Sequence, residues 1–288
     1  MVQRIRLVIH GGLIDHEDGE ESRQPRREAL QQILDAGYQV LESQDALQAV
    51  IQACALLEDN PLFNAGTGAT IQRDGQFRLS SGLMDGNRQS FSGVINGRLI
   101  KNPIHLAGKL QQFEDRLLDS TGVEIQARSL GLEVYDPGTP ELVNRWAEFR
   151  FTPRFTRSHG TVGAVAVDAQ GKLAAATSTG GRFMAGAGRV SDSCTPAGNY
   201  ADESCAVSCT GHGEDILDEA LATRIVVRVG DGLSLEAAVE RSFHEAKERS
   251  RDFAAICVDL DGNAHCAETL GLLVAAYRND AGAFTTTF

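Results

Sequence analysis

The sequence predicts an α+β fold in which two β-sheets are stacked between layers of helices, a four-layer αββα sandwich. Strand-like segments lie near the start, just past the middle and at the end of the chain. Segments with the spacing of amphipathic helices are grouped between them. Stacking the sheets on each other and the helices on the sheets buries every apolar face. The 288 residues, 42% of them hydrophobic, are enough for one domain spanning 1–288 with a sizeable core.

The first half of the chain begins with a predicted strand at 4–9, followed by helical spacing over 28–58. Gly37 is predicted to divide this stretch into two helices, and Ser43 to cap the second. The rest of this half is predicted to hold a hairpin over 69–73 and 76–80, a strand near 91–99, and helices near 103–118 and 139–149.

The second half begins after a segment without a clear period, 147–160, which is predicted to be an exposed linker. Two alternating segments, 161–168 and 172–179, flank a turn and predict a hairpin. The remaining patterns predict helices at 213–228 and 233–250, then strands at 253–259, 263–268 and 271–277.

Composition limits the kinds of partner. The net charge of −12, from 27 Lys+Arg against 39 Asp+Glu, argues against nucleic acid or an anionic membrane as a partner. No apolar run approaches the roughly 20 residues needed to span a bilayer. The N-terminal segment lacks the long apolar stretch of a signal peptide, so we expect a cytoplasmic protein with its six cysteines reduced.

The most informative pair of residues is Gly160-Thr161, which opens the strand-like run 162–167. If the bond between them were cut, Thr161 would carry both a hydroxyl nucleophile and a free α-amino group. Such an amine titrates near pKa ~8 and can serve as a general base. Gly160 suits the cut because strained backbone costs least without a Cβ. The alternative is an ordinary threonine in a core strand.

Residues that follow Thr161 offer what an amide hydrolase needs. Thr179 would face Thr161 across the predicted hairpin. Arg189 provides a planar fork for a substrate carboxylate, and Asp192 a partner for a substrate ammonium group. A turn that opens a helix carries two potential oxyanion donors, the hydroxyl of Thr210 and the amide of Gly211. Taken singly, these residues could instead be a surface ion pair, flexible loop or a helix start, and Asn64 an ordinary turn residue.

Together these segments resemble the plant-type asparaginase/isoaspartyl peptidase family of N-terminal-nucleophile hydrolases. The resemblance covers nearly the whole chain in the family's order. It is carried by the segments 10–12, 60–68, 84–86, 100–104, 159–165, 177–181, 188–193 and 208–214.

The resemblance implies an αββα sandwich that cuts itself before Thr161 into an α subunit, 1–160, and a β subunit, 161–288. A dimer of such pairs is expected. The implied roles are nucleophile for Thr161, its hydrogen-bond partner for Thr179, substrate ligands for Arg189, Asp192 and Gly213, oxyanion donors for Thr210 and Gly211, and a position beside the nucleophile for Asn64. The family also implies a structural sodium ion, bound by main-chain oxygens that here match Leu57, Glu58, Asn60, Phe63, Ala65 and Thr67, and no catalytic cofactor.

The expected function is hydrolysis of β-aspartyl dipeptides and L-asparagine through a threonine acyl-enzyme, releasing aspartate. Two alternatives remain open at this point: a glycosylasparaginase, and an uncleaved, catalytically silent member with a binding or structural role. The chain departs from the family's usual residues at Leu13-Ile14, Ser191, His212 and Ala267-Glu268-Thr269.

Overall fold

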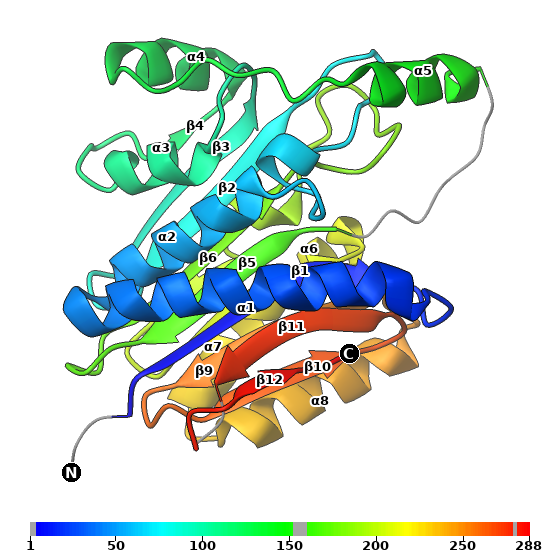
Figure 1. Cartoon of the computed structure of the whole chain (residues 1–288). Helices are drawn as coiled ribbons and strands as arrows, with labels where there is room; N and C mark the ends of the chain where they lie inside the picture. Colours follow the sequence, from blue (N-terminus) through cyan, green and yellow to red (C-terminus); the bar gives the residue numbers. More distant parts are fainter. Residues whose placement is uncertain (1–3, 152–159, 279–280) are drawn as a thin grey trace.

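The computed structural model describes residues 4–151, 160–278 and 281–288 (Figure 1). Two sheets form its centre. The larger has the strand order β12-β11-β1-β5-β6-β2-β3-β4, and the smaller has the order β10-β9-β8-β7. Their bounds are β1 (Arg6–Ile14), β2 (Leu79–Asp85), β3 (Ser90–Gly97), β4 (Leu117–Leu118), β5 (Val162–Val167), β6 (Leu173–Thr179), β7 (Asn199–Ala201), β8 (Cys205–Gly211), β9 (Phe253–Asp259), β10 (Ala264–Glu268), β11 (Leu272–Arg278) and β12 (Phe284–Thr286).

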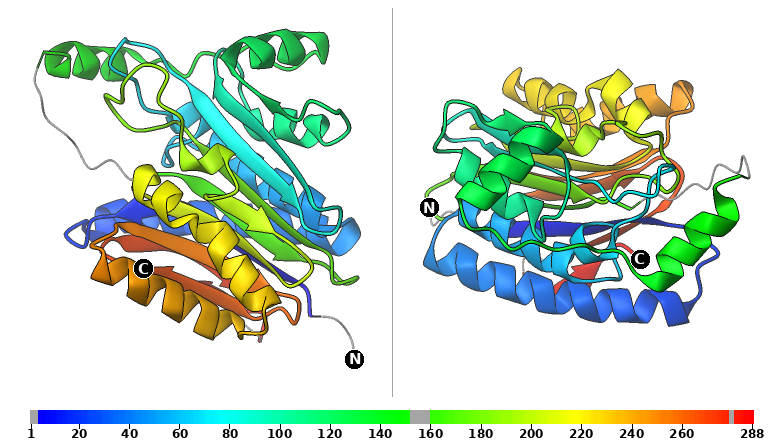
Figure 2. Two further views of the ribbon diagram at one scale, coloured as in Figure 1. Left: turned by 180° about the vertical axis from the view of Figure 1, so that it is seen from behind. Right: turned by 90° about the horizontal axis from the view of Figure 1, so that it is seen from above.

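Alternation along the central strands directs side chains to the two faces of the large sheet. Leu7 and Ile9 of β1 pack in the cluster formed with helices α1 (Glu20–Ser43), α2 (Ala46–Asp59) and α3 (Pro103–Leu110). The intervening Val8 points to the other face, where it joins residues of the small sheet such as Ile256. Figure 2 shows α1 and α2 along one side of the molecule.

The small sheet packs its other face against α7 (Leu221–Gly230) and α8 (Leu235–Glu248). Val207 and Cys209 of β8 belong to this cluster, whereas Ala206 faces the large sheet. Three further helices are α4 (Ser120–Ser129), α5 (Pro140–Phe149) and α6 (Gly213–Glu219): α4 adds Val123 and Ala127 to the first cluster, α6 adds Ile216 to the cluster of the small sheet, and α5 has no buried residue. The protein is therefore a mixed α/β structure, as the sequence predicts.

Gly37 does not divide the first helix, which corrects one prediction. A Cβ on Gly37 would lie 2.5 Å from Leu7 Cδ2, so the glycine allows α1 to approach β1 closely. The helix continues to Ser43, and the next helix is capped by Asp45, whose side chain accepts a hydrogen bond from Gln48 N at 2.9 Å. Ser43 is thus not the cap.

Other differences concern element length. The predicted hairpin over 69–73 and 76–80 is reduced to one bridge, Ile71 to Phe77, and the regular strand begins later, at Leu79. The helix expected over 103–118 ends at Leu110 and is followed by β4 and α4, which were not predicted. The helix expected over 213–228 is interrupted at Ala220, whose φ of 45° is left-handed. Strands β7, β8 and β12 were also missed.

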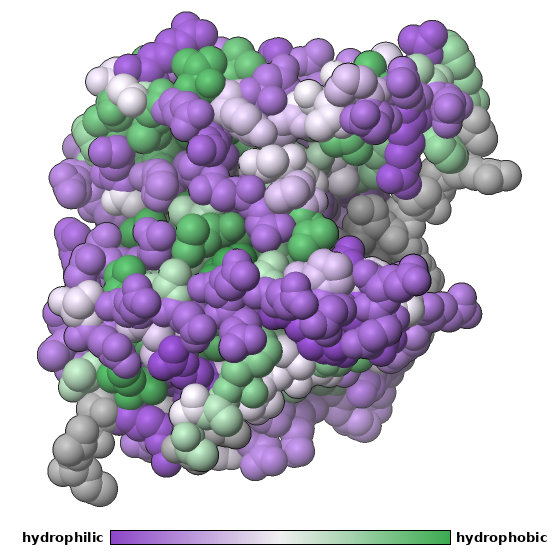
Figure 3. Space-filling view, in the orientation of Figure 1, coloured by the Kyte–Doolittle hydropathy of each residue, from purple (hydrophilic) through white to green (hydrophobic). Residues whose placement is uncertain are grey.

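The predicted linker 147–160 begins later than expected because α5 extends through Phe149. Its central part, 152–159, lies outside the described residues. Within the described parts of the chain, no helix is long and apolar enough to cross a membrane. On the face drawn in Figure 3, hydrophilic residues predominate and hydrophobic ones form small groups among them.

Candidate active site

Thr161 and Thr179 meet at the open end of the hairpin formed by β5 and β6. The antiparallel register pairs Val162 with Ser178, which brings the preceding and following threonines opposite each other. The Thr161 hydroxyl donates to Thr179 Oγ1 at 3.3 Å, and the Thr179 hydroxyl faces the carbonyl oxygen of Gly160 at 3.4 Å. Both threonines are buried. The hydroxyls of Thr161 and Thr179 and the carbonyl of Gly160 are therefore adjacent.

Asn64 packs next to this pair, against Gly160 and Gly180. The side-chain Nδ2 of Asn64 donates to the carbonyl of Gly181 at 2.7 Å, and the main-chain carbonyl of Asn64 accepts from Gly180 N at 2.9 Å. A Cβ on Gly160 would lie 2.6 Å from Asn64 Cβ, so only glycine fits against this side chain. The loop after α2 and the loop after β6 are thereby held on either side of the Gly160–Thr161 bond.

Arg189, Asp192 and Gly213 lie together on the other side of the pocket. A Cβ on Gly213 would be 2.4 Å from Arg189 Nη2 and 2.6 Å from Asp192 Oδ1. The absence of a side chain at Gly213 thus leaves both charged groups open toward the pocket. A guanidinium and a carboxylate side by side can hold the zwitterionic head of an amino acid.

Arg189 is positioned by a residue that the sequence analysis did not single out. Glu214, at the start of α6, accepts from Arg189 Nε at 3.0 Å and from Nη2 at 3.1 Å. Partial burial raises the pKa of this carboxyl, but the hydrogen bonds and charge of Arg189 outweigh it, and the pKa falls to about 2. Because Glu214 occupies two of the five guanidinium N–H groups, three remain for a ligand.

Asp192 is almost fully buried, and this burial raises its pKa to about 6 although the Arg189 charge lowers it. Oδ1 accepts from the hydroxyl of Ser191 at 3.1 Å. Oδ2 is buried and has no hydrogen-bond partner among the described residues. Oδ2 lies on the side of Gly198, whereas Oδ1 lies on the side of Gly213, which lines the pocket, so Oδ1 is the oxygen placed to accept from a ligand's ammonium group.

The two predicted oxyanion donors lie at the end of β8. Gly211 lines the pocket and has a φ of 131°, which glycine alone tolerates readily. A Cβ added at Gly211 would also lie only 2.5 Å from Phe253 Cα, so close packing is a second reason why this position needs glycine. Thr210 is fully buried behind Gly211, and its hydroxyl has no hydrogen-bond partner within the described chain. Thr210 is not part of the pocket wall.

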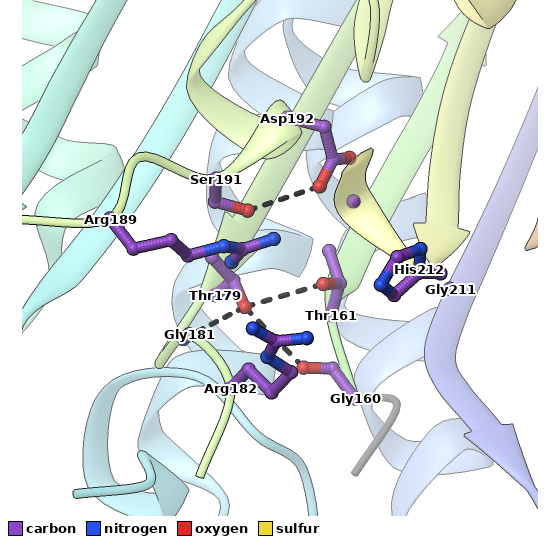
Figure 4. Close-up of a pocket in the computed structure, with 11 residues that line it drawn as sticks. Gly160, Thr161, Thr179, Gly181, Arg182, Arg189, Ser191, Asp192, Gly211 and His212 are labelled. Atoms are coloured by element: carbon purple, nitrogen blue, oxygen red, sulfur yellow. Dashed lines mark hydrogen bonds between the residues drawn. The ribbon is translucent and has the colours of Figure 1, made fainter. Parts of the chain in front are cut away.

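One pocket is lined by all these candidate site residues except Asn64, Thr210 and Glu214. Figure 4 shows Thr161 and Thr179 with Arg182, Arg189 and Asp192 around one space. The pocket is also lined by four residues for which no role was predicted: Gly181, Arg182, Ser191 and His212. The sequence signal that could have identified them is their position inside or next to the segments 177–181, 188–193 and 208–214.

His10 is a further buried group close to the site. It pairs with Gly163 of β5, and its Nε2 is 2.9 Å from the hydroxyl of Ser208, which is 2.7 Å from that of Thr177. Complete burial lowers the pKa of His10 to about 3, although an interaction with the Thr161 backbone raises it. The ring is therefore neutral at physiological pH and links β1 of the large sheet to β8 of the small sheet close to Thr161.

The loop for which the sequence analysis expects a bound cation runs from the end of α2 to a 3₁₀ turn at Gly66–Gly68. Added Cβ atoms would lie 2.4 Å from the Glu58 carbonyl oxygen at Gly66, and 2.0 Å from the Phe63 carbonyl oxygen at Gly68. Main-chain oxygens are thus crowded around two glycines. The expected ligands all belong to this loop or its flanks: Leu57, Glu58, Asn60, Phe63, Ala65 and Thr67.

These oxygens have the right chemistry for a hard cation. The carbonyls of Leu57, Asn60, Phe63 and Ala65 each accept one hydrogen bond inside the loop, and a carbonyl oxygen has a second lone pair. No cluster of three or more His, Cys, Asp or Glu side chains suited to a metal occurs in the described segments. A cation here would therefore depend on the main chain.

The side chain of Glu58 has a separate, structural role. It accepts from the hydroxyl of Ser178 at 2.6 Å and from Ile104 N at 3.2 Å. Complete burial raises its pKa to about 8. This contact joins α2 to β6 one residue before Thr179, so it connects the start of the loop after α2 to the β5–β6 hairpin.

The chain belongs to the asparaginase family, whose sequence model matches residues 3–287. It is 45% identical over 287 residues to an isoaspartyl peptidase/L-asparaginase of Synechocystis sp., covering 94% of this chain and 87% of that protein. It is 43% identical over 292 residues to the same-named protein of Nostoc sp., with 95% and 92% covered. A plant-type L-asparaginase of Pyrococcus abyssi is 36% identical over 290 residues, with 92% and 93% covered. These matches confirm the resemblance found in the sequence motifs.

Proposed function

We propose that this chain is a self-processing amidohydrolase that cleaves β-aspartyl dipeptides and L-asparagine and releases L-aspartate. The observation that carries the proposal is the position of the Thr161 hydroxyl. It lies 3.3 Å from Thr179 Oγ1 in the same pocket as Arg189 and Asp192. The names of the Synechocystis and Nostoc relatives support the same substrates.

Processing would begin with attack of Thr161 Oγ1 on the carbonyl carbon of Gly160. The peptide C–N bond breaks as the C–O bond forms, which leaves an ester and a free amine on Thr161. Water then hydrolyses the ester, giving the α subunit 1–160 with a Gly160 carboxylate and the β subunit 161–288. The contact of the Thr179 hydroxyl with the Gly160 carbonyl, at 3.4 Å, supports a role for Thr179 in orienting this group.

Hydrolysis of the substrate would repeat the same chemistry on a side-chain amide. The α-amine of Thr161 takes the proton from its hydroxyl, Oγ1 attacks the amide carbon, and the proton passes to the departing nitrogen. Ammonia leaves from asparagine, and an amino acid leaves from a β-aspartyl dipeptide. Water then cleaves the acyl-enzyme and releases aspartate.

The remaining residues would hold the substrate and its charge. Arg189 binds the α-carboxylate and Asp192 the α-ammonium group, with Gly213 leaving room for both. The Gly211 amide and the Thr210 hydroxyl are the proposed oxyanion donors, and the Thr210 hydroxyl has no hydrogen-bond partner among the described residues that would compete for it. Asn64 positions the loop that contacts Gly160.

The wider setting follows from the family. We propose one domain over 1–288 with the αββα sandwich of N-terminal-nucleophile hydrolases, assembled as a homodimer of αβ pairs in the cytoplasm. We propose small-molecule substrates, with no nucleic acid or membrane partner. A structural sodium ion would be held by main-chain oxygens of Leu57, Glu58, Asn60, Phe63, Ala65 and Thr67, and it would stiffen the loop that carries Asn64.

The first experiment is intact mass and N-terminal sequencing of fresh and incubated protein, followed by assays for aspartate release. Fragments of 160 and 128 residues (288 − 160 = 128), the second beginning at Thr161, are expected. Release of aspartate from asparagine and from β-aspartyl dipeptides should appear with them. Thr161→Ala should abolish both processes, and Thr161→Ser should retain part of each. A Thr161→Ala protein that is cut and active would contradict the proposal.

A further inference from the structure

The pocket contains two guanidinium groups with different surroundings. Arg189 is bound through two N–H groups to Glu214. Arg182 also lines the pocket, yet its side chain has no hydrogen-bond or ion-pair partner among the described residues. It is partly buried, where an unpaired charge costs more than at an exposed position. A cation kept without a partner beside the nucleophile calls for an anionic ligand.

The main chain around Arg182 is fixed on both sides. Asn64 Nδ2 holds the carbonyl of Gly181 at 2.7 Å. Phe183 is buried, with its ring edge-on to Phe149 of α5 at a centroid distance of 6.0 Å. Met184 N then donates to the Ile71 carbonyl at 3.0 Å. The position of the Arg182 side chain is therefore set by a held loop.

The two guanidinium groups approach the nucleophile from different directions. In Figure 4 the Arg182 guanidinium is drawn toward Gly160 and Thr161, whereas that of Arg189 lies toward Ser191 and Asp192. Arg189 and Asp192 flank Gly213, on the side where the aspartyl head is placed. If the aspartyl head lies between Arg189 and Asp192, the Arg182 guanidinium is on the side left for the departing group.

The two proposed substrates differ on this side. Asparagine releases ammonia, which has no further charge. A β-aspartyl dipeptide releases an amino acid whose α-carboxylate is joined to the departing nitrogen through one Cα atom. A guanidinium within reach of Thr161 and distinct from the head-group site matches that carboxylate by charge and by its planar fork.

We propose that Arg182 is a specificity-determining residue that binds the α-carboxylate of the leaving amino acid in β-aspartyl dipeptides. The inference rests on the proposed function, because it assigns a substrate part to the same pocket. It adds a second carboxylate subsite to the one formed by Arg189. The charge of Arg182 also contributes to keeping Glu214 ionised, so a purely electrostatic support of the Arg189–Glu214 pair is the competing role.

The test compares β-Asp-Ala with its C-terminal amide, β-Asp-Ala-NH₂, which differs only in the charge of the leaving group. The values of kcat/KM are normalised to the fraction of chains that begin at Thr161. Wild-type protein should prefer the acid about tenfold, mainly through KM. Arg182→Met, which keeps the apolar stem, should bring the acid-to-amide ratio close to one, and Arg182→Lys should restore part of the preference.

Arg241→Met is the matched control, because Arg241 lies on α8 with its side chain 64% exposed and outside the pocket. An acid-to-amide ratio that is equal in wild type and Arg182→Met overturns the inference. If Arg182 only supports the Arg189–Glu214 pair, Arg182→Met should lower kcat/KM for the acid, the amide and asparagine by similar factors. That result would also overturn the inference. Wild-type protein that is active on asparagine but shows no acid preference contradicts this inference alone. Protein inactive on every substrate contradicts the proposed function together with it.

Discussion

Thr161 and Thr179 face each other across the open end of the β5–β6 hairpin, with their hydroxyl oxygens 3.3 Å apart. Thr179 Oγ1 also accepts from Gly181 N at 3.1 Å, which fixes its rotamer. The Thr179 hydroxyl is consequently free to donate toward the Gly160 carbonyl. One strand residue thus contacts both the attacking oxygen and the carbonyl that the proposed self-cleavage would attack.

Replacing Thr179 by Val tests this arrangement with little change of shape. The loss of the hydroxyl leaves Thr161 Oγ1 without its acceptor and the Gly160 carbonyl without its donor. Self-cleavage should slow by at least about tenfold, the equivalent of one lost hydrogen bond of ~1.5 kcal/mol. Densitometry of the uncut chain over time provides the rate. Thr179→Ser should stay within a few-fold of wild type, and a Val variant that cleaves at the normal rate would exclude the role of Thr179.

The raised pKa of Asp192, about 6, predicts a pH dependence of substrate capture. Below that pH the carboxyl is protonated and loses its attraction for the substrate's ammonium group. The Thr161 amine, with an ordinary pKa near 8, must also be neutral to act as a base. A plot of log(kcat/KM) against pH should therefore rise with a slope near two below pH 6 and near one from there to pH 8.

The Asp192→Asn variant tests whether the transition near pH 6 in this profile belongs to Asp192. The variant should be at least about tenfold weaker in kcat/KM at pH 8, because a charged contact to the ammonium group is lost. Its profile should show a slope near one throughout, without the transition near pH 6. Persistence of that transition in the variant would assign it to another group.

Gly213→Ala should damage substrate binding without removing any functional group. The new Cβ would lie 2.4 Å from Arg189 Nη2 and 2.6 Å from Asp192 Oδ1, so both side chains must move. We expect KM to rise about tenfold or more while the rate of self-cleavage changes less. Gly186→Ala is the matched control, since nothing lies within 4 Å of its added Cβ. Equal effects of the two substitutions would contradict the position given to Gly213.

His10 predicts a loss of stability in acid. Its folded-state pKa of about 3 lies below the ordinary value of 6.5, so the unfolded chain binds more protons between these pH values. The contribution of His10 to stability is complete above pH 6.5 and is lost as the pH falls toward 3, at up to about 1.4 kcal/mol per pH unit. Urea unfolding at pH 7.0 and 5.5 can measure this in the uncleaved Thr161→Ala background.

The quantity to compare between variants is the loss of unfolding free energy from pH 7.0 to 5.5, because other groups titrate over the same pH range. Between pH 7.0 and 5.5 the parent should lose about 1 kcal/mol more than the His10→Gln variant. His244→Gln, on the exposed surface of α8, controls for removing a histidine. Identical losses for the parent and His10→Gln would show that His10 is not buried as a neutral ring.

Much of the site geometry could be predicted because it depends on a single hairpin. Strand alternation and a short turn decide the register of β5 and β6, and this register alone brings Thr161 opposite Thr179. Arg189, Asp192 and Gly213 were also predicted to act together, and the structure brings them to one wall of the pocket. Their chemical roles stay predictions until activity is measured.

Element boundaries were less predictable where packing overrides local preference. Gly37 looks like a helix breaker in the sequence, but its missing Cβ is used for contact with Leu7 of β1. Ala220 carries no local sign of its left-handed backbone, which nonetheless separates α6 from α7. For Gly37 the deciding contact is with a strand far away in the sequence, which local periodicity does not identify.

The sequence by itself determined the family, the alternation of the central strands and the residue types brought to the pocket. These depend on local spacing and on motifs, both of which are readable along the chain. Only the tertiary structure decided that Glu214 occupies two N–H groups of Arg189 and that His10 is buried against Ser208. It also decided that Arg182 lines the pocket with Thr161 and has no hydrogen-bond or ion-pair partner in the described part of the chain. Such partners are joined by the order and stacking of the sheets, and burial then sets their charge.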